Sequence, residues 1–206
     1  DGRVCGSAIY ANTTVTFIGM KPGLLTHQGT EYSGEIILRN LDIDTSTLIE
    51  PQSWVLDLPY IQQLLPPPRP ANSHKGMFGS VGIIGGSAGM TGAALLAGTA
   101  ALKLGSGRVY LGLITENILT FSPVQPELMF RSPHELFKLD HLNCLVIGPG
   151  LGMSADAYSW LDCALKSSQS LVLDADALNL ISVYPELANT LSNRNAHTVL
   201  TPHAAE

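Results

Sequence analysis

Small and acidic residues that could bind a small molecule follow four short apolar runs of this sequence. The four segments are GGSAGMTGA (85–93), GPGLG (148–152), DADALN (174–179) and TPH (201–203). Each apolar run before them is typical of a buried strand in a parallel sheet. Ligands of such sheets bind beyond the carboxyl ends of the strands. The four segments therefore predict one composite small-molecule site with nucleotide or phosphate chemistry.

The first segment predicts a turn whose backbone approaches a ligand. Glycines such as Gly86 leave backbone N–H groups accessible, and the N-terminus of the helix expected over 92–104 would attract an anion. The segment lacks the GxGxxG spacing, however, and no acidic residue ends the next predicted strand near Leu113. Simple turn packing is the alternative interpretation.

The second and third segments suggest more specific roles. Gly148 and Gly150 would form a rim without side chains, against which a ring or a phosphate can lie, although an ordinary strand-to-loop turn is the alternative. Asp174 and Asp176 could reach a common ligand or a Mg²⁺ ion, with Asn179 one turn further on. The alternative for one of the aspartates is an N-cap of the following helix.

Two further residues are weaker candidates. His203 stands alone, but Pro202 ends the strand and directs the imidazole to the same crevice. Lys75 in His-Lys-Gly is either a phosphate contact or a solvated lysine. No GxSxG, HExxH or GxxxxGK[ST] motif occurs, which disfavours hydrolase and P-loop functions.

Composition excludes several other classes. The 206 residues carry a net charge of -6, which argues against nucleic-acid binding, and 45% hydrophobic residues suffice for a packed core. The three cysteines show no metal-binding spacing, and with no secretory leader this favours reduced thiols and a cytoplasmic protein. No apolar run reaches the ~18 residues of a membrane span. The chain does not begin with Met, so we expect a processed or cut N-terminus.

The order of the elements predicts an α/β fold with a parallel sheet and helices on both faces. We expect an N-terminal piece over 1–49, a linker over 50–70 that includes the stiff LLPPPRP, and a larger domain over 71–206. The expected strands are 13–17, 35–38, 81–86, 108–113, 144–147, 170–174 and 197–201. The expected helices are 92–104 ended by Gly105, 155–166 capped by Ser154, and one that begins within 177–191.

The succession SHKGMFGSVGIIGGSAGMTGAALLAGTAALKLGSG, PELMF, IGPGLG, LDADALN and LTPHAAE resembles the ADP- or ATP-dependent NAD(P)H-hydrate dehydratases, which have a ribokinase-like fold. The resemblance runs from about residue 72 to residue 206. The segment 11–25 resembles the end of the NAD(P)H-hydrate epimerase domain that precedes the dehydratase in bifunctional bacterial repair enzymes.

The resemblance implies a metabolite-repair lyase that dehydrates S-NADHX or S-NADPHX to NADH or NADPH. ADP or ATP, with Mg²⁺, would phosphorylate the ring hydroxyl, and phosphate would then be eliminated. Family contacts to the hydrated cofactor correspond to Ala93, Gly150 and His203.

The positions of the remaining candidates suggest their roles at this site. Asp174 and Asp176 would be catalytic, with Asp176 also a metal ligand. Further contacts to the nucleotide would come from Lys75, Gly86, Gly148 and Asn179.

Two departures from the family pattern generate expectations. The family's glycine-rich GxGD loop, with its catalytic base, would lie beyond Glu206, so we expect a sheet incomplete at the C-terminus, a homo-oligomer and little turnover. Asn12 stands where the epimerase pattern has an acidic residue, so epimerase activity is not assigned to this chain. A small-molecule kinase of the ribokinase superfamily and a non-catalytic nucleotide-binding module are the alternatives.

Overall fold

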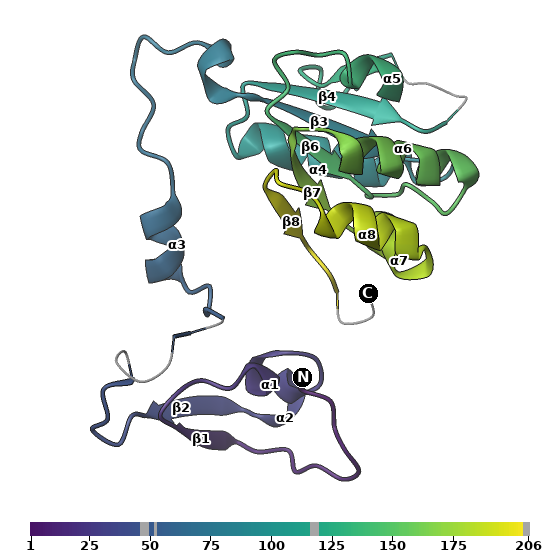
Figure 1. The fold of residues 1–206 in the computed structure, drawn as a ribbon. Coiled ribbons are helices and arrows are strands. Elements are labelled where there is room, and N and C mark those ends of the chain that lie inside the picture. The colour runs from purple at the N-terminus through teal and green to yellow at the C-terminus, as the bar shows by residue number, and fades with distance from the viewer. Residues whose placement is uncertain (46–49, 52, 116–119, 204–206) are drawn as a thin grey trace. The chain divides into compact units, whose positions relative to one another are not determined.

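The computed structural model describes residues 1–45, 50–51, 53–115 and 120–203, in two compact units, Asp1–Pro68 and Arg69–Glu206. Figure 1 traces the chain through both units, which are described separately here. Among the described residues, no helix combines the length and the apolar character that a membrane crossing requires.

The N-terminal unit contains both strands expected from its sequence. Strands β1 (Thr13–Phe17) and β2 (Glu35–Arg39) pair in parallel, and the short helices α1 (Pro22–Leu25) and α2 (Gly29–Tyr32) connect them. Helix α3 (Leu58–Leu64) lies within the range predicted as linker and was not expected. The Asp57 side chain caps it by accepting a hydrogen bond from the N–H of Tyr60, which explains why this short segment is helical.

The C-terminal unit is built on a parallel sheet of six strands in the order β5-β4-β3-β6-β7-β8. The strands are β3 (Ser80–Gly85), β4 (Arg108–Leu113), β5 (Met129–Arg131), β6 (Cys144–Ile147), β7 (Ser170–Leu173) and β8 (Thr198–Leu200). The chain adds β4 and β5 on one side of β3 and then returns to add β6, β7 and β8 on the other. The strand order therefore reverses between β3 and β6, which is where ligands of open α/β sheets bind.

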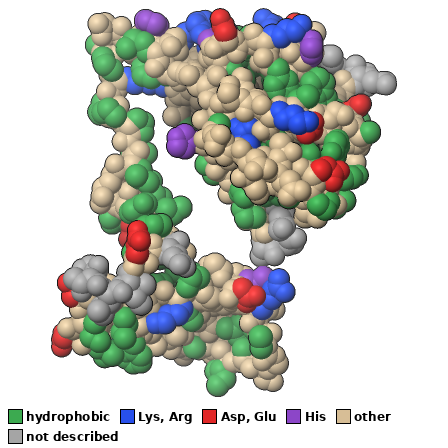
Figure 2. All heavy atoms as spheres, viewed as in Figure 1, with side chains coloured by type: hydrophobic (Ala, Val, Ile, Leu, Met, Phe, Trp, Pro, Cys, Tyr) green, Lys and Arg blue, Asp and Glu red, His purple; other side chains and the backbone are tan. Residues whose placement is uncertain are grey.

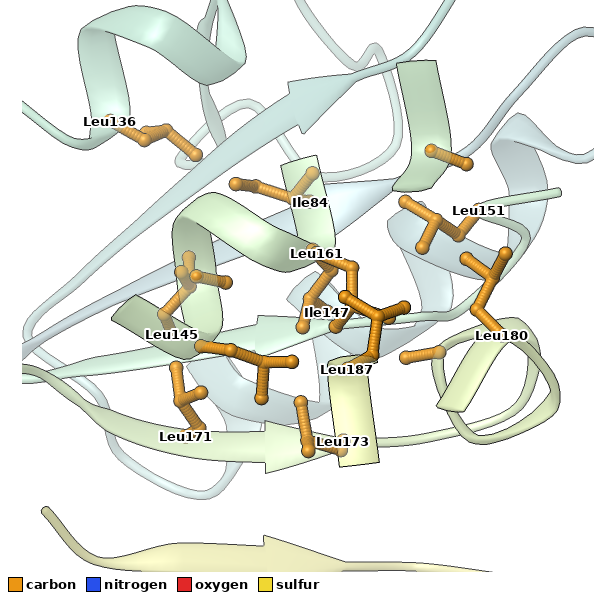
Figure 3. Packing of buried hydrophobic residues seen from close by; sticks show 14 of the residues in the cluster. Ile84, Leu136, Leu145, Ile147, Leu151, Leu161, Leu171, Leu173, Leu180 and Leu187 are labelled. Atoms are coloured by element: carbon orange, nitrogen blue, oxygen red, sulfur yellow. The ribbon is translucent and has the colours of Figure 1, made fainter. Parts of the chain in front are cut away.

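Helices cover both faces of the sheet, as the sequence predicts (Figure 1). Helix α4 (Thr91–Lys103) packs on one face. The opposite face is covered by α5 (Pro133–Leu136), α6 (Ala155–Lys166), α7 (Asp176–Val183) and α8 (Pro185–Ser192). Figure 3 shows the second layer, where Leu145 and Ile147 of β6 pack with Leu161 of α6 and Leu187 of α8.

The face that carries α4 is covered unevenly. Ile83, Val146, Val172 and Val199 lie side by side in register across β3, β6, β7 and β8. Ile83 is fully buried, whereas Val199 is 55% exposed. The apolar row thus loses its cover with distance from α4, and the self-association expected from the sequence remains a prediction. Figure 2 shows Lys and Arg side chains interspersed among other residues on the visible face.

In the C-terminal unit, strand β5, the short helix α5 and the division of one expected helix differ from the sequence prediction. Strand β5 was not expected, because its three residues carry too short a pattern. The helix expected to begin within 177–191 is two helices, since Pro185 lacks an N–H group and begins α8. The predicted cap of α6 is confirmed, because the Ser154 side chain accepts from the N–H of Ala157.

Arg194 joins three elements at the amino-terminal ends of the strands. Its guanidinium donates to the backbone carbonyls of Ala164, Leu165, Ser167 and Gln169, and its Nε donates to Thr198 Oγ1. The side chain thereby satisfies carbonyls at the end of α6 and ties them to the start of β8. It also lines a cavity of about 510 Å³.

We predict that Arg194→Ala lowers the free energy of unfolding by about 2 kcal/mol, because several charge-assisted hydrogen bonds are lost together. Urea unfolding measures the change. Arg131→Ala is the matched control, since within the described part of the chain the exposed Arg131 guanidinium makes one hydrogen bond, to the carbonyl of Phe130. Equal losses in the two variants would contradict the bridging role of Arg194.

Candidate functional site

Backbone hydrogen bonds join the turns that follow β3 and β6, on either side of the point where the strand order reverses. The N–H of Gly86 donates to the carbonyl of Pro149 at 3.0 Å, and the N–H of Ser87 donates to the carbonyl of Gly150 at 2.7 Å. The GGSAGMTGA and GPGLG segments therefore form one connected surface at the expected ligand position.

The two aspartates extend this connection to the turns after β7 and β8. Asp176 Oδ2 accepts from the N–H of Gly152 at 2.7 Å, and Asp174 Oδ1 accepts from the Thr201 hydroxyl at 2.7 Å. The N-cap of α7 is Ala175, and it makes no side-chain cap bond. Neither aspartate is therefore the N-cap that was the alternative interpretation. All four predicted segments are joined in the order of the strands.

The glycines of the second segment face protein rather than open space. Gly148 has a φ of +129°, and a Cβ built there would lie 1.7 Å from the carbonyl oxygen of Asp174. Gly150 has a φ of +61°, and its Cβ would lie 2.7 Å from the carbonyl oxygen of Met90. Both residues are buried. Gly148 and Gly150, which were predicted to form a rim for a ligand, instead pack their turn against neighbouring turns. This packing leaves no room for a side chain and therefore requires glycine.

The first segment contains the open part of the site. Ala88, Gly89 and Met90 are exposed, and a Cβ at the exposed Gly92 would meet nothing within 4 Å. Met90, the N-cap of α4, makes no side-chain cap bond, and the N-terminus of a helix carries a partial positive charge. This arrangement can bind an anionic group of a ligand through backbone N–H groups.

The other predicted residues are placed at different distances from this surface. Ala93 is partly exposed, and a Cβ built at Gly150 would lie 3.2 Å from the Cβ of Ala93. Gly86 is buried under Leu113 and Ala94. Ala93 therefore lies beside Gly150 of the second turn.

His203 belongs to the segment after β8 and Asn179 belongs to α7, whereas Lys75 precedes β3. His203 is exposed two residues after Thr201, and Asn179 is partly buried one turn into α7. Lys75 begins a 3₁₀ helix (Lys75–Phe78) before β3, with its carbonyl oxygen beside Gly107, which precedes β4. The structure therefore does not bring Lys75 to the predicted site, because it lies at the amino-terminal ends of the strands.

The described residues do not form a preassembled magnesium site. Within residues 1–45, 50–51, 53–115 and 120–203, no group of three or more His, Cys, Asp or Glu could hold a metal ion. Asp174 and Asp176 each use a carboxylate oxygen to accept a hydrogen bond. In nucleotide sites Mg²⁺ usually binds through one or two carboxylates together with waters and substrate phosphates, so any Mg²⁺ here would take most of its ligands from those sources.

The sequence analysis assigned no individual role to three residues of the site. Gly152 and Thr201 were parts of motifs without assigned roles, and Ala175 was passed over between the two aspartates. Ala175 has a φ of +48° and a ψ of -120°, which is unusual for a residue with a Cβ. The role of Thr201 could have been recognised, because a threonine directly after a predicted strand can bind a neighbouring turn. The unusual backbone conformation of Ala175 cannot be recognised from its residue type.

Comparison with solved structures identifies the class of fold. A ribokinase-like superfamily protein from Enterococcus faecalis is 28% identical, with a TM-score of 0.54 over 67% of this chain and 50% of that one. The ADP/ATP-dependent NAD(P)H-hydrate dehydratase of Bacillus subtilis, co-crystallised with ATP/Mg²⁺, is 30% identical, with a TM-score of 0.54 over 70% of this chain and 51% of that one. The C-terminal unit thus has the ribokinase-like fold that the sequence predicted.

Comparison of sequences then identifies the family. The family model for NAD(P)H-hydrate dehydratase matches residues 81–206. The bifunctional NAD(P)H-hydrate repair enzyme Nnr of Coxiella burnetii is 37% identical over an alignment of 215 positions, which covers 100% of this chain and 42% of that protein. The chain belongs to the NAD(P)H-hydrate dehydratase family, and it spans about two fifths of the length of this relative.

We predict that Gly148→Ala destabilises the protein by about 3 kcal/mol or more, because the new methyl group meets the backbone of Asp174 at a positive φ. Gly92→Ala is the control, since its methyl group enters open space in a helix, and it should change stability by less than about 1 kcal/mol. Thermal unfolding compares the two. A stable Gly148→Ala protein would show that the turns do not pack in this way.

Proposed function

We propose that this chain provides the substrate-binding part of a dehydratase that converts S-NADHX or S-NADPHX to NADH or NADPH at the expense of ADP or ATP. The observation that carries the proposal is the series of hydrogen bonds that joins four family motifs at the carboxyl ends of the strands. Family membership supports the reaction class.

In this proposal the hydrated cofactor lies over the first two turns. Ala93 contacts it, Gly150 holds the second turn beside Ala93, His203 approaches it from the turn after β8, and the N-terminus of α4 attracts its phosphates. Gly86 and Gly148 act by keeping the turns close together, and Asn179 lies on the helix beside them. The proposal leaves out Lys75 because of its place at the other end of the strands.

The chemistry requires the ring hydroxyl to become a better leaving group. Transfer of a phosphoryl group from the nucleotide achieves this, and the chain contributes mainly by holding the ring and excluding wrong orientations. Mg²⁺ would neutralise charge on the phosphates when bound. Because the described residues gather no metal-binding cluster, the proposal has Mg²⁺ arrive with the nucleotide.

We further propose that residues 1–49 correspond to the end of an NAD(P)H-hydrate epimerase domain and that the whole protein also interconverts the R and S epimers. Similarity to the bifunctional Coxiella enzyme over the full chain supports this assignment. A cytoplasmic location is consistent with the free thiols of Cys5, Cys144 and Cys163.

The activity test uses the whole protein that carries this chain, incubated with S-NADHX, Mg²⁺ and either ADP or ATP. We expect nucleotide-dependent growth of the reduced-nicotinamide absorbance. Accumulation of a phosphorylated product without NADH would favour a kinase. Tight binding without any turnover would favour a non-catalytic module.

A substitution at the open end of α4 tests where the substrate lies. Gly92→Leu should weaken S-NADHX binding by at least ~10-fold, about 1.4 kcal/mol, because the side chain would occupy the space before the helix N-terminus. Calorimetry without nucleotide measures the affinity. Ala100→Leu is the control, since Ala100 is exposed near the other end of α4. Undiminished affinity in Gly92→Leu would place the substrate elsewhere.

A further inference from the structure

The two aspartates come from the turn after β7, which lies between β6 and β8 in the sheet. Asp174 reaches the turn after β8, where it accepts from the Thr201 hydroxyl. Asp176 reaches the turn after β6, where it accepts from the N–H of Gly152. The two carboxylates thus bind different neighbours, on opposite sides of their own strand.

The backbone between the two carboxylates is in an unfavourable conformation. Ala175 has a φ of +48° and a ψ of -120°, where a Cβ is poorly tolerated. Such a conformation persists only where surrounding contacts determine it, and the two carboxylate bonds flank it directly. The turn after β7 is therefore held from both sides.

Both contacts lead to residues of the proposed substrate site. Gly152 ends the turn that contains Gly150, whose carbonyl accepts from the N–H of Ser87 in the first turn. The N–H of Thr201 donates to the carbonyl of Leu173 at 3.1 Å, so Thr201 is fixed through both its backbone and its hydroxyl. Thr201 precedes His203 by two residues.

We propose that Asp174 and Asp176 are positioning residues, whose carboxylates brace the turns after β8 and β6 and so fix His203 and Gly150 for the substrate. This inference rests on the proposed function. It differs from a catalytic or metal-ligand role because it requires only a hydrogen-bond acceptor at each position, whereas a general base requires the carboxylate and a metal ligand is weakened when its charge is lost.

Substitution of Asp176 by Asn and by Ala separates these roles. An Asn carbonyl can still accept from the N–H of Gly152, so Asp176→Asn should keep S-NADHX affinity within about threefold, whereas Asp176→Ala should lose at least ~10-fold. Asp156→Ala is the control, an exposed acidic residue in the first turn of α6. If Asn proves as harmful as Ala, the charge of Asp176 is required and the brace is overturned.

A double-mutant cycle tests the second carboxylate. The Thr201 hydroxyl also lies 3.3 Å from the carbonyl oxygen of Leu173, but its bond to Asp174 Oδ1, at 2.7 Å, is the shorter one. Asp174→Ala and Thr201→Val each remove one partner of this shorter bond, so the double variant should lose little more affinity for S-NADHX than the Thr201→Val variant alone. Additive losses would show that Asp174 acts on something other than Thr201 and would contradict its positioning role.

A measurement without ligand distinguishes failure of the brace from failure of the proposed function. In nuclear magnetic resonance spectra of the free chain, the Gly152 amide proton should exchange slowly in the native protein and in Asp176→Asn, and faster in Asp176→Ala. Equal exchange rates in all three would overturn the brace itself. If exchange is faster in Asp176→Ala but S-NADHX affinity is undiminished, the hydrogen bond between Gly152 and Asp176 exists but does not position the substrate site.

Discussion

The hydrogen bonds between neighbouring turns at the carboxyl ends of the strands are the constraint on which the site depends. Each of these turns alone is a short loop, and loops are ordinarily the variable part of an α/β unit. Here Gly86 and Ser87 bind the carbonyls of the next turn, and Asp176 and Asp174 continue the connection toward β8. Four loops from separate stretches of sequence thereby become one surface.

This constraint explains why the glycines of the motifs have different roles. Gly148 and Gly150 are buried where one turn packs against another, so their missing side chains serve the protein's own packing. Gly92 lies in the open, beside the uncapped start of α4. A glycine-rich motif can therefore combine positions that the fold needs with positions at which a ligand can approach, and the space around each Cβ distinguishes them.

The sequence predicted most of the fold because its buried strands and helix caps have strong local patterns. The expected strand 144–147 and helix 155–166 match β6 and α6, and the Ser154 cap is where it was predicted. Strand β5 was missed because three residues carry little periodicity. The strand order could not be read from local patterns, since it depends on how elements distant in sequence pack together.

The site was predictable as a set of motifs but not as a set of contacts. Four strand-end turns were expected to meet, yet the partners of Asp174 and Asp176 depend on the order β6-β7-β8, which spacing alone does not reveal. Lys75 was proposed from its neighbours in sequence, and the parallel sheet places it at the opposite end. The backbone of Ala175 is set by tertiary contacts, so its residue type gives no indication of it.

Titration of the isotope-labelled chain with S-NADHX, followed by amide chemical shifts, tests the central claim that the four turns form one binding surface. The account predicts that signals from 86–93, 148–152, 174–176 and 201–203 shift together and saturate at one concentration. Signals near Lys75 and in the cavity beside Arg194 should remain unchanged. Shifts confined to one turn, or centred on the Arg194 cavity, would contradict it.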